Sequence, residues 1–309
     1  LIPEAQALVE GFTGLAIQGY PSRPWVMTRG EWLQANLRGF HRVLEPFAAN
    51  AMKRVRDGAL AEVRRKTLGA QIGALMGYMG RKVLGQYDLF LPADDDGLLY
   101  FVGPNVVGVE RRFRFPERDF RLWVGLHEVA HRVQFGAVPW LRGHVSGLMD
   151  SYLSSLELDP KRLMETLKRA VREVRSGAVE WRGVGWVFLL MTPDQRDLLT
   201  RMQSMMALLE GHGNFVMNGV GNGRIPNLET FRRKLHERRQ GHGMERAFQR
   251  AIGFDAKVRQ YDIGERFVAE AVERAGMEGF NRVWERPSNL PTLAEIARPD
   301  EWLARVGVA

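Results

Sequence analysis

Apolar residues recur at three- and four-residue intervals along most of this chain, which is the spacing of one face of an α-helix. The pattern therefore predicts a mainly helical protein. The expected helices cover residues 4–16, 29–47, 52–82, 117–135, 145–156, 160–176, 193 through 210 and beyond, 228–237, 244–251, 264–275 and 278–285. Residues 182–190 fit neither a helix nor a strand clearly.

One stretch alternates apolar residues with others at the period of two that is typical of strands. We expect strands over residues 87–91, 98–103 and 105–115, the last of them ended by Pro116. The expected fold class is therefore mainly α with a small antiparallel β-sheet (α+β).

The chain has 309 residues, which is enough for one large domain with a sizeable core. We expect a single unit over residues 1–309, with N-terminal helices in 1–85, the small sheet and the helix after it in 86–145, and a C-terminal helical region in 146–309.

No apolar run reaches the roughly 18 residues that a membrane-spanning helix needs. We therefore expect a soluble, cytoplasmic protein with no membrane partner.

The formal charge of +8 is compatible with an acidic partner. The excess is spread over short basic runs, among them residues 111–112, 232–234 and 238–239, with apolar residues between them. We interpret these runs as solvated helix faces. Nucleic-acid binding is the alternative, but it rests on the pI of about 10.0 alone, and no nucleic-acid motif accompanies it.

The clearest chemical signal is H-E-x-x-H at residues 127–131, within a helical pattern. Four residues turn an α-helix by roughly 400°, so His127 and His131 face the same side. Two imidazoles in this arrangement can bind one metal ion, and Glu128 beside them can act as a general base toward an activated water molecule. The chain has no cysteine, so any metal must be held by histidine and carboxylate groups.

A catalytic zinc ion takes three protein ligands, so a third ligand must come from elsewhere. The next histidine, His144, fits a loop or a helix start better than a metal site. Glu210 is the stronger candidate, because an unpaired carboxylate in its apolar run is costly and a metal ion removes that cost. Pairing with an arginine or helix capping is the alternative role for Glu210. His212 lies roughly 200° around the helix from Glu210, so we expect it to support a ligand or to donate to a reaction oxyanion.

Several stretches of the chain carry a family resemblance. They are WVGLHEVAHR at 123–132 with PWL at 139–141, VLGQYD at 83–88, LEGHG at 209–213, KVRQYDIGERF at 257–267, and LPT at 290–292 with PDEW at 299–302. Over about residues 70–305 the sequence resembles a family of zincin-like proteins. Its members are named hydrolases or zinc-dependent metallopeptidase-like proteins, and some are labelled as associated with biosynthesis of a deazaflavin coenzyme.

The resemblance implies a zincin-like fold with H-E-x-x-H on a central helix. It also implies that His127, His131 and Glu210 are the metal ligands and that Glu128 is the general base. A zincin-like site of this kind binds one Zn²⁺ per chain.

These observations predict a zinc-dependent metallohydrolase, and we favour a metallopeptidase with a peptide or small-molecule substrate in a cleft. An extended peptide is expected to pair with an edge strand at residues 105–111. The candidates for stabilising the reaction oxyanion are Tyr261, His212 and Arg259.

Two other classes of protein fit the same sequence. One is a non-catalytic protein that uses the zincin fold as a binding module or scaffold, and the other is a basic nucleic-acid-associated protein. A metal site with an open coordination position favours the enzyme over the scaffold. The sequence does not predict an oligomeric state.

Overall fold

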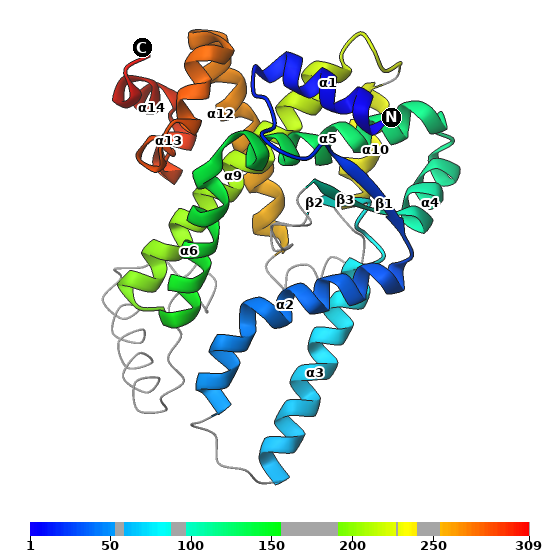
Figure 1. The fold of residues 1–309 in the computed structure, drawn as a ribbon, viewed down its shortest axis with the longest axis vertical. Helices are drawn as coiled ribbons and strands as arrows, with labels where there is room; N and C mark the ends of the chain where they lie inside the picture. Colours follow the sequence, from blue (N-terminus) through cyan, green and yellow to red (C-terminus); the bar gives the residue numbers. More distant parts are fainter. Residues whose placement is uncertain (53–58, 88–96, 156–190, 227, 240–253, 309) are drawn as a thin grey trace.

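The computed structural model describes residues 1–52, 59–87, 97–155, 191–226, 228–239 and 254–308. Within these residues the protein is mainly helical, with one small sheet (Figure 1). In chain order the elements are α1 (Ile2–Thr13), β1 (Arg23–Met27), α2 (Arg29–Met52), α3 (Ala59–Met79), β2 (Gly85–Tyr87), β3 (Leu98–Val102), α4 (Gly103–Phe113), α5 (Glu117–Ala137), α6 (Pro139–Ser155), α9 (Pro193–Gly221), α10 (Leu228–Arg239), α12 (Phe254–Phe280), the 3-10 helices η2 (Asn281–Trp284) and η3 (Pro287–Asn289), α13 (Leu293–Ala297) and α14 (Pro299–Val306).

The predicted mainly helical class is confirmed. The expected helices at 160–176 and 244–251, the ambiguous segment 182–190 and residues 88–91 of an expected strand lie outside the described residues. None of the helices in the described ranges is both long enough and apolar enough to cross a bilayer.

The sheet is mixed rather than antiparallel, which corrects the predicted fold class. β3 lies in the middle and pairs in parallel with β1 and antiparallel with β2. No period-two pattern marks β1, because it is an edge strand in which only Met27 is buried. Without alternating burial, a strand leaves no alternating sequence signal.

The expected strand over residues 105–115 is wrong, because this segment forms α4. Pro104 lies in the first turn, where its fixed φ suits a helix and its missing N–H is not needed. The buried residues of α4 are Asn105, Val106, Val109 and Glu110, which follow helical and not alternating spacing. Residues 105–111 therefore offer no strand edge to a peptide.

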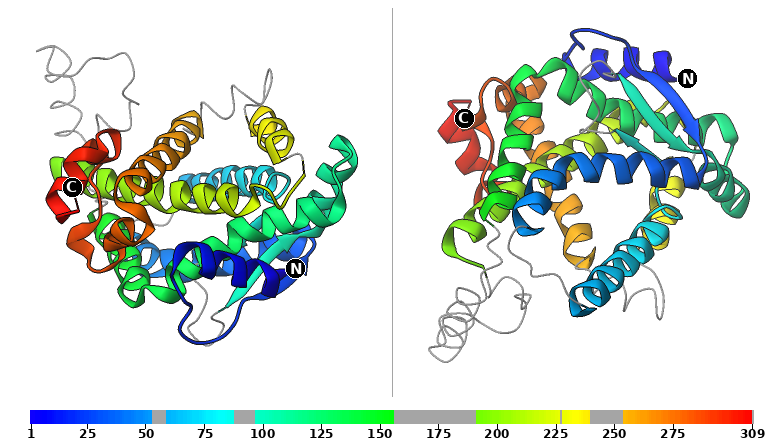
Figure 2. Two further views of the ribbon diagram at one scale, coloured as in Figure 1. Left: turned by 90° about the horizontal axis from the view of Figure 1, so that it is seen from above. Right: turned by 60° about the horizontal axis from the view of Figure 1, so that its bottom comes forward.

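α5 lies at the centre of the fold and packs against both α1 and α9 (Figure 2). Val129 of α5, Val9 of α1 and Val216 of α9 belong to one buried cluster. A second cluster joins α9 to α12 and the C-terminal helices, and it includes Leu208 and Phe267. Burial of these side chains holds α9 between the two clusters, because removing apolar surface from water is the main favourable contribution to folding.

α9 and α12 cross at a point where both helices carry glycine. A Cβ on Gly264 would overlap the carbonyl oxygen of Ala207, and a Cβ on Gly211 would overlap the carbonyl group of Gly264. The two backbones are thus in direct contact at this crossing. Neither glycine can be replaced without moving one helix away from the other.

Gly264→Ala is expected to lower the free energy of unfolding by about 1–3 kcal/mol, because the added methyl group must separate α12 from α9. Gly143→Ala is the matched control: it lies within α6, where a Cβ would meet nothing within 4 Å. Alanine there should raise stability by up to about 1 kcal/mol. Urea titrations followed by circular dichroism measure both variants, and equal changes would contradict the close crossing.

Candidate metal centre

The two histidines of the motif lie one turn apart on α5. The ring centroids of His127 and His131 are 4.7 Å apart and the ring planes meet at 87°. Their Nε2 atoms lie 3.2 Å from each other. The helix therefore directs both Nε2 atoms to one point, as the four-residue spacing predicts.

α9 brings a carboxylate to the same point. Oε2 of Glu210 lies 3.6 Å from Nε2 of His127 and 3.8 Å from Nε2 of His131. Each of the three residues offers one ligand atom, and these atoms lie within 4.8 Å of one another. The side chains are 18% exposed for His127, 13% for His131 and 22% for Glu210. Solvent therefore reaches the site.

This geometry fits a single metal ion. Tetrahedral ligands bound at about 2.0–2.2 Å lie about 3.3–3.6 Å from one another, close to the distances between these three atoms. Two imidazoles and one carboxylate are a ligand set found in catalytic zinc sites, which keep one coordination position open. Burial, with a smaller contribution from His127, lowers the pKa of His131 and so favours the neutral imidazole that metal binding requires.

Gly213 allows α9 to approach the two imidazoles. It lies one turn after Glu210, and a Cβ there would be 3.2 Å from Cε1 of His131 and 3.5 Å from Cε1 of His127. α9 continues without interruption through this region. The sequence Glu210-Gly211-His212-Gly213 is therefore regular helix, and its glycines serve close packing rather than a break.

Glu128 lies next to the histidines and is held by the sheet. Its Oε2 accepts a hydrogen bond from the backbone N–H of Tyr87 at 3.0 Å. The carboxylate also packs over Gly85, where a Cβ would lie 2.6 Å from Cγ of Glu128. Burial raises the pKa of Glu128 to about 7; Glu210 adds to this effect, while His127 and the Tyr87 N–H oppose it. A carboxyl group with this pKa can exchange protons at neutral pH.

Gln134 supports His131 and was not among the residues predicted from the sequence. Its Oε1 accepts from Nδ1 of His131 at 3.0 Å. Its Nε2 donates to the carbonyl oxygen of Leu209 at 2.9 Å and to Nδ1 of His212 at 2.8 Å. The bond to His131 leaves the lone pair of Nε2 for a metal. The available signal was its position three residues after His131, on the same face of α5.

His212 lies behind Gln134 and is fully buried. Its ring stacks on Phe280 at 5.5 Å and meets Trp284 edge-on at 5.4 Å. Burial, with a small contribution from His131, lowers the pKa of His212 to about 3, so the ring is neutral at physiological pH. The structure thus connects His212 to His131 through Gln134 and does not place it with the three converging ligand atoms.

Tyr261 and Arg259, the other oxyanion candidates, lie on α12. Their side chains are outside the part of the chain whose side chains the structure describes. Their role at the site stays a prediction.

Tyr87 and Arg142 form a further polar pair close to Glu128. The backbone of Tyr87 binds Glu128, and its ring stacks on Phe135 at 5.4 Å. Arg142 of α6 donates to the Tyr87 hydroxyl at 2.6 Å. Sequence reasoning missed this pair, because Tyr87 and Arg142 meet only through the tertiary fold.

Comparisons with known proteins agree with this geometry. Residues 1–303 match the family of zincin-like metallopeptidases. A crystal structure from Chloroflexus aurantiacus, described as a candidate hydrolase with a novel fold, is 32% identical in sequence. The structural match covers 100% of this chain and 88% of the Chloroflexus chain, with a TM-score of 0.72. None of the curated proteins matches the chain. The predicted resemblance is confirmed, and the chain belongs to the zincin-like metallopeptidase family.

Proposed function

We propose that the protein is a zinc-dependent metallopeptidase in which Glu128 is the general base. The observation that carries this proposal is the convergence of His127, His131 and Glu210, with a buried carboxyl group of pKa about 7 beside them. Family membership supports a hydrolytic reaction on peptide bonds. A purely structural metal site would not require a proton-exchanging carboxylate at its edge.

In this proposal His127, His131 and Glu210 hold the ion. When bound, zinc supplies Lewis-acid activation of water and of the scissile carbonyl group. Gln134 keeps His131 in the required tautomer, and His212 supports Gln134 from the buried side.

Glu128 performs the proton transfer. Its Oε2 is engaged by the Tyr87 N–H, which leaves Oε1 to accept a proton from the attacking water. The same carboxyl group then delivers this proton to the nitrogen of the leaving amine. Gly85 matters here because a side chain at that position would displace the carboxylate.

We assign to the Tyr87–Arg142 pair the role of stabilising the negative charge that develops on the substrate carbonyl oxygen. The Arg142 guanidinium donates to the Tyr87 hydroxyl, which strengthens that hydroxyl as a donor. Stacking on Phe135 fixes the orientation of the Tyr87 ring. Tyr261 remains a second candidate for this role.

Metal analysis by mass spectrometry is the first test. The native chain should carry about one zinc, and Glu210→Ala should lose it, because a catalytic site needs three protein ligands. Asp197→Ala is the control, since it removes an exposed carboxylate from the same helix without touching the site. Zinc that persists in Glu210→Ala would exclude Glu210 as a ligand.

Glu128→Gln should keep the zinc and lower kcat/KM for a cleaved peptide by about 10²–10⁴-fold, because glutamine cannot accept the proton. A peptide-library screen of the native enzyme supplies the substrate for this comparison. Glu117→Gln makes the same change at an exposed site on α5 and should leave activity unchanged. Unaltered cleavage by Glu128→Gln would show that Glu128 is not the base.

Gln134→Leu should weaken zinc binding about 10–100-fold, because the His131 Nδ1–H loses its acceptor. Asn289→Leu is the matched control: it also replaces a buried amide, but that amide bonds to Arg282 and Arg286. It should reduce stability while leaving zinc affinity at the native value. Competition with a chromogenic chelator measures both affinities, and equal losses would assign Gln134 a role in folding only.

A further inference from the structure

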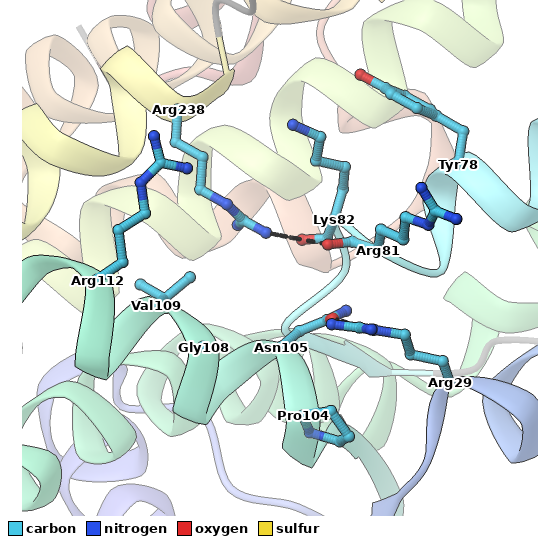
Figure 3. Close-up of a pocket in the computed structure, with 10 residues that line it drawn as sticks. All are labelled: Arg29, Tyr78, Arg81, Lys82, Pro104, Asn105, Gly108, Val109, Arg112 and Arg238. Carbon is cyan, nitrogen blue, oxygen red and sulfur yellow. Dashed lines mark hydrogen bonds between the residues drawn. The ribbon is translucent and has the colours of Figure 1, made fainter.

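A second concave site is lined by positive charge and shares no lining residue with the metal centre (Figure 3). Its volume is about 560 Å³, and it lies where the start of α2, the end of α3, α4 and α10 meet. Five cationic side chains line it: Arg29, Arg81, Lys82, Arg112 and Arg238. We call this site the basic pocket.

Three of these cations are not neutralised within the described residues. Arg29 donates from Nε to the neutral Oδ1 of Asn105 at 2.7 Å. The guanidinium of Arg112 lies 5.3 Å from the centroid of the Phe113 ring, and Arg81 is exposed. The described lining of the pocket contains no carboxylate. Gathering like charges around one cavity costs electrostatic energy, which a bound anion would offset.

A buried amide positions one side of the basic pocket. Asn105 is 3% exposed, and its Nδ2 donates to the carbonyl oxygens of Gly80 and Val83 at 2.8 and 2.7 Å. Its Oδ1 accepts from Arg29. One side chain of α4 therefore fixes both Arg29 and the segment that follows α3.

Arg238 of α10 holds the same segment from the other side. It donates to the carbonyl oxygens of Arg81 and Lys82 at 3.3 and 3.1 Å (Figure 3). The backbone that presents Arg81 and Lys82 is thus fixed by both α4 and α10. A backbone that is already fixed loses less conformational entropy when its side chains bind a ligand.

We propose that the basic pocket binds a small molecule that carries two or more phosphate groups. Guanidinium groups bind phosphate oxygens through paired hydrogen bonds, and Arg29, Arg81 and Arg112 together exceed the charge of one phosphate. The volume lies within the range of small-molecule sites. Val109 in the lining offers an apolar contact to the rest of the ligand.

The shape favours such a ligand over nucleic acid. Nucleic-acid surfaces track an extended backbone and present aromatic rings for base stacking. Here the cations line one hollow, and Nζ of Lys82 lies 5.7 Å from the centroid of the Tyr78 ring, over its face. The basic runs at 111–112 and 238–239, interpreted from the sequence as solvated faces, each contribute one residue to this pocket.

Isothermal titration calorimetry with inorganic pyrophosphate and inorganic phosphate tests the proposal on the full chain. The native protein should bind pyrophosphate more tightly than phosphate. Arg112→Ala and Arg81→Ala should each weaken pyrophosphate binding at least about tenfold. Arg111→Ala removes the same charge from an exposed neighbour outside the pocket and should keep native affinity.

All three variants retain His127, His131 and Glu210. Pyrophosphate that bound at the metal centre would therefore bind all three variants equally. Absence of pyrophosphate binding, or an equal loss in Arg111→Ala, would overturn the proposal. Tighter binding of a 12-nucleotide single-stranded DNA that also needs Arg112 would overturn it in favour of a nucleic-acid surface. Failure of the proposed peptidase activity would leave each of these outcomes unaffected.

Discussion

The close passage of α9 between α5 and α12 is the constraint on which the rest of the structure depends. Helices with ordinary side chains at the contact pack with their axes 8–10 Å apart. Gly213 removes the side chain facing the imidazoles, and Gly211 meets Gly264 backbone to backbone. Both contacts fall within one turn of Glu210, so the position of its carboxylate follows from how closely the helices approach. An alanine at Gly211 would therefore shift the α9 backbone that carries Glu210, whereas an alanine at Gly213 would press directly on the two imidazoles.

Close packing also makes the interior dry, and this determines how the polar groups behave. Gln134 and His212 are fully buried, and unpaired polar groups in such a place would be costly. The hydrogen bonds among His131, Gln134 and His212 give partners to the Gln134 amide and to Nδ1 of His212, and they leave the metal-facing nitrogen of His131 available. Nε2 of His212 is buried without a hydrogen-bond partner among the described residues. The same dryness acts on Glu128, whose pKa rises because its charged form loses solvation. Packing and acid–base properties thus have one physical origin in this site.

The part of the site that could be predicted is the part that depends on local geometry. His127 and His131 converge because four residues make about one helical turn, a relation that holds in any helix. Glu210 was recognisable as a carboxylate in an apolar run, although its contact with α5 could not be derived from spacing. Gln134 bonds to His131 within α5, but its bonds to Leu209 and His212 form only in the tertiary fold. The Tyr87–Arg142 pair also forms only in the tertiary fold, so residue type alone did not single these residues out.

The fold was predictable to the same extent. Helical periodicity is strong where one face is buried and the other solvated, and most described helices satisfy this condition. The alternation through residues 105–115 was misleading because Val107 and Arg111 do not belong to the buried face of α4. β1 lacked a signal for the opposite reason, since it buries too little to require a pattern. In both segments the tertiary environment decided the outcome over local preference.

The small sheet has a consequence for Glu128 that concerns strand register. β2 has three residues and pairs Tyr87 with Leu99 and Gly85 with Phe101. In this register the Tyr87 N–H reaches Glu128, and Gly85 lies beneath the carboxylate. A slip of one residue would exchange the two faces of β2, turn that N–H toward β3 and place a side chain where Gly85 now lies. The pairing of three residues therefore sets the position of a carboxylate on a helix more than forty residues away, which is a reason for a mainly helical protein to retain so small a sheet.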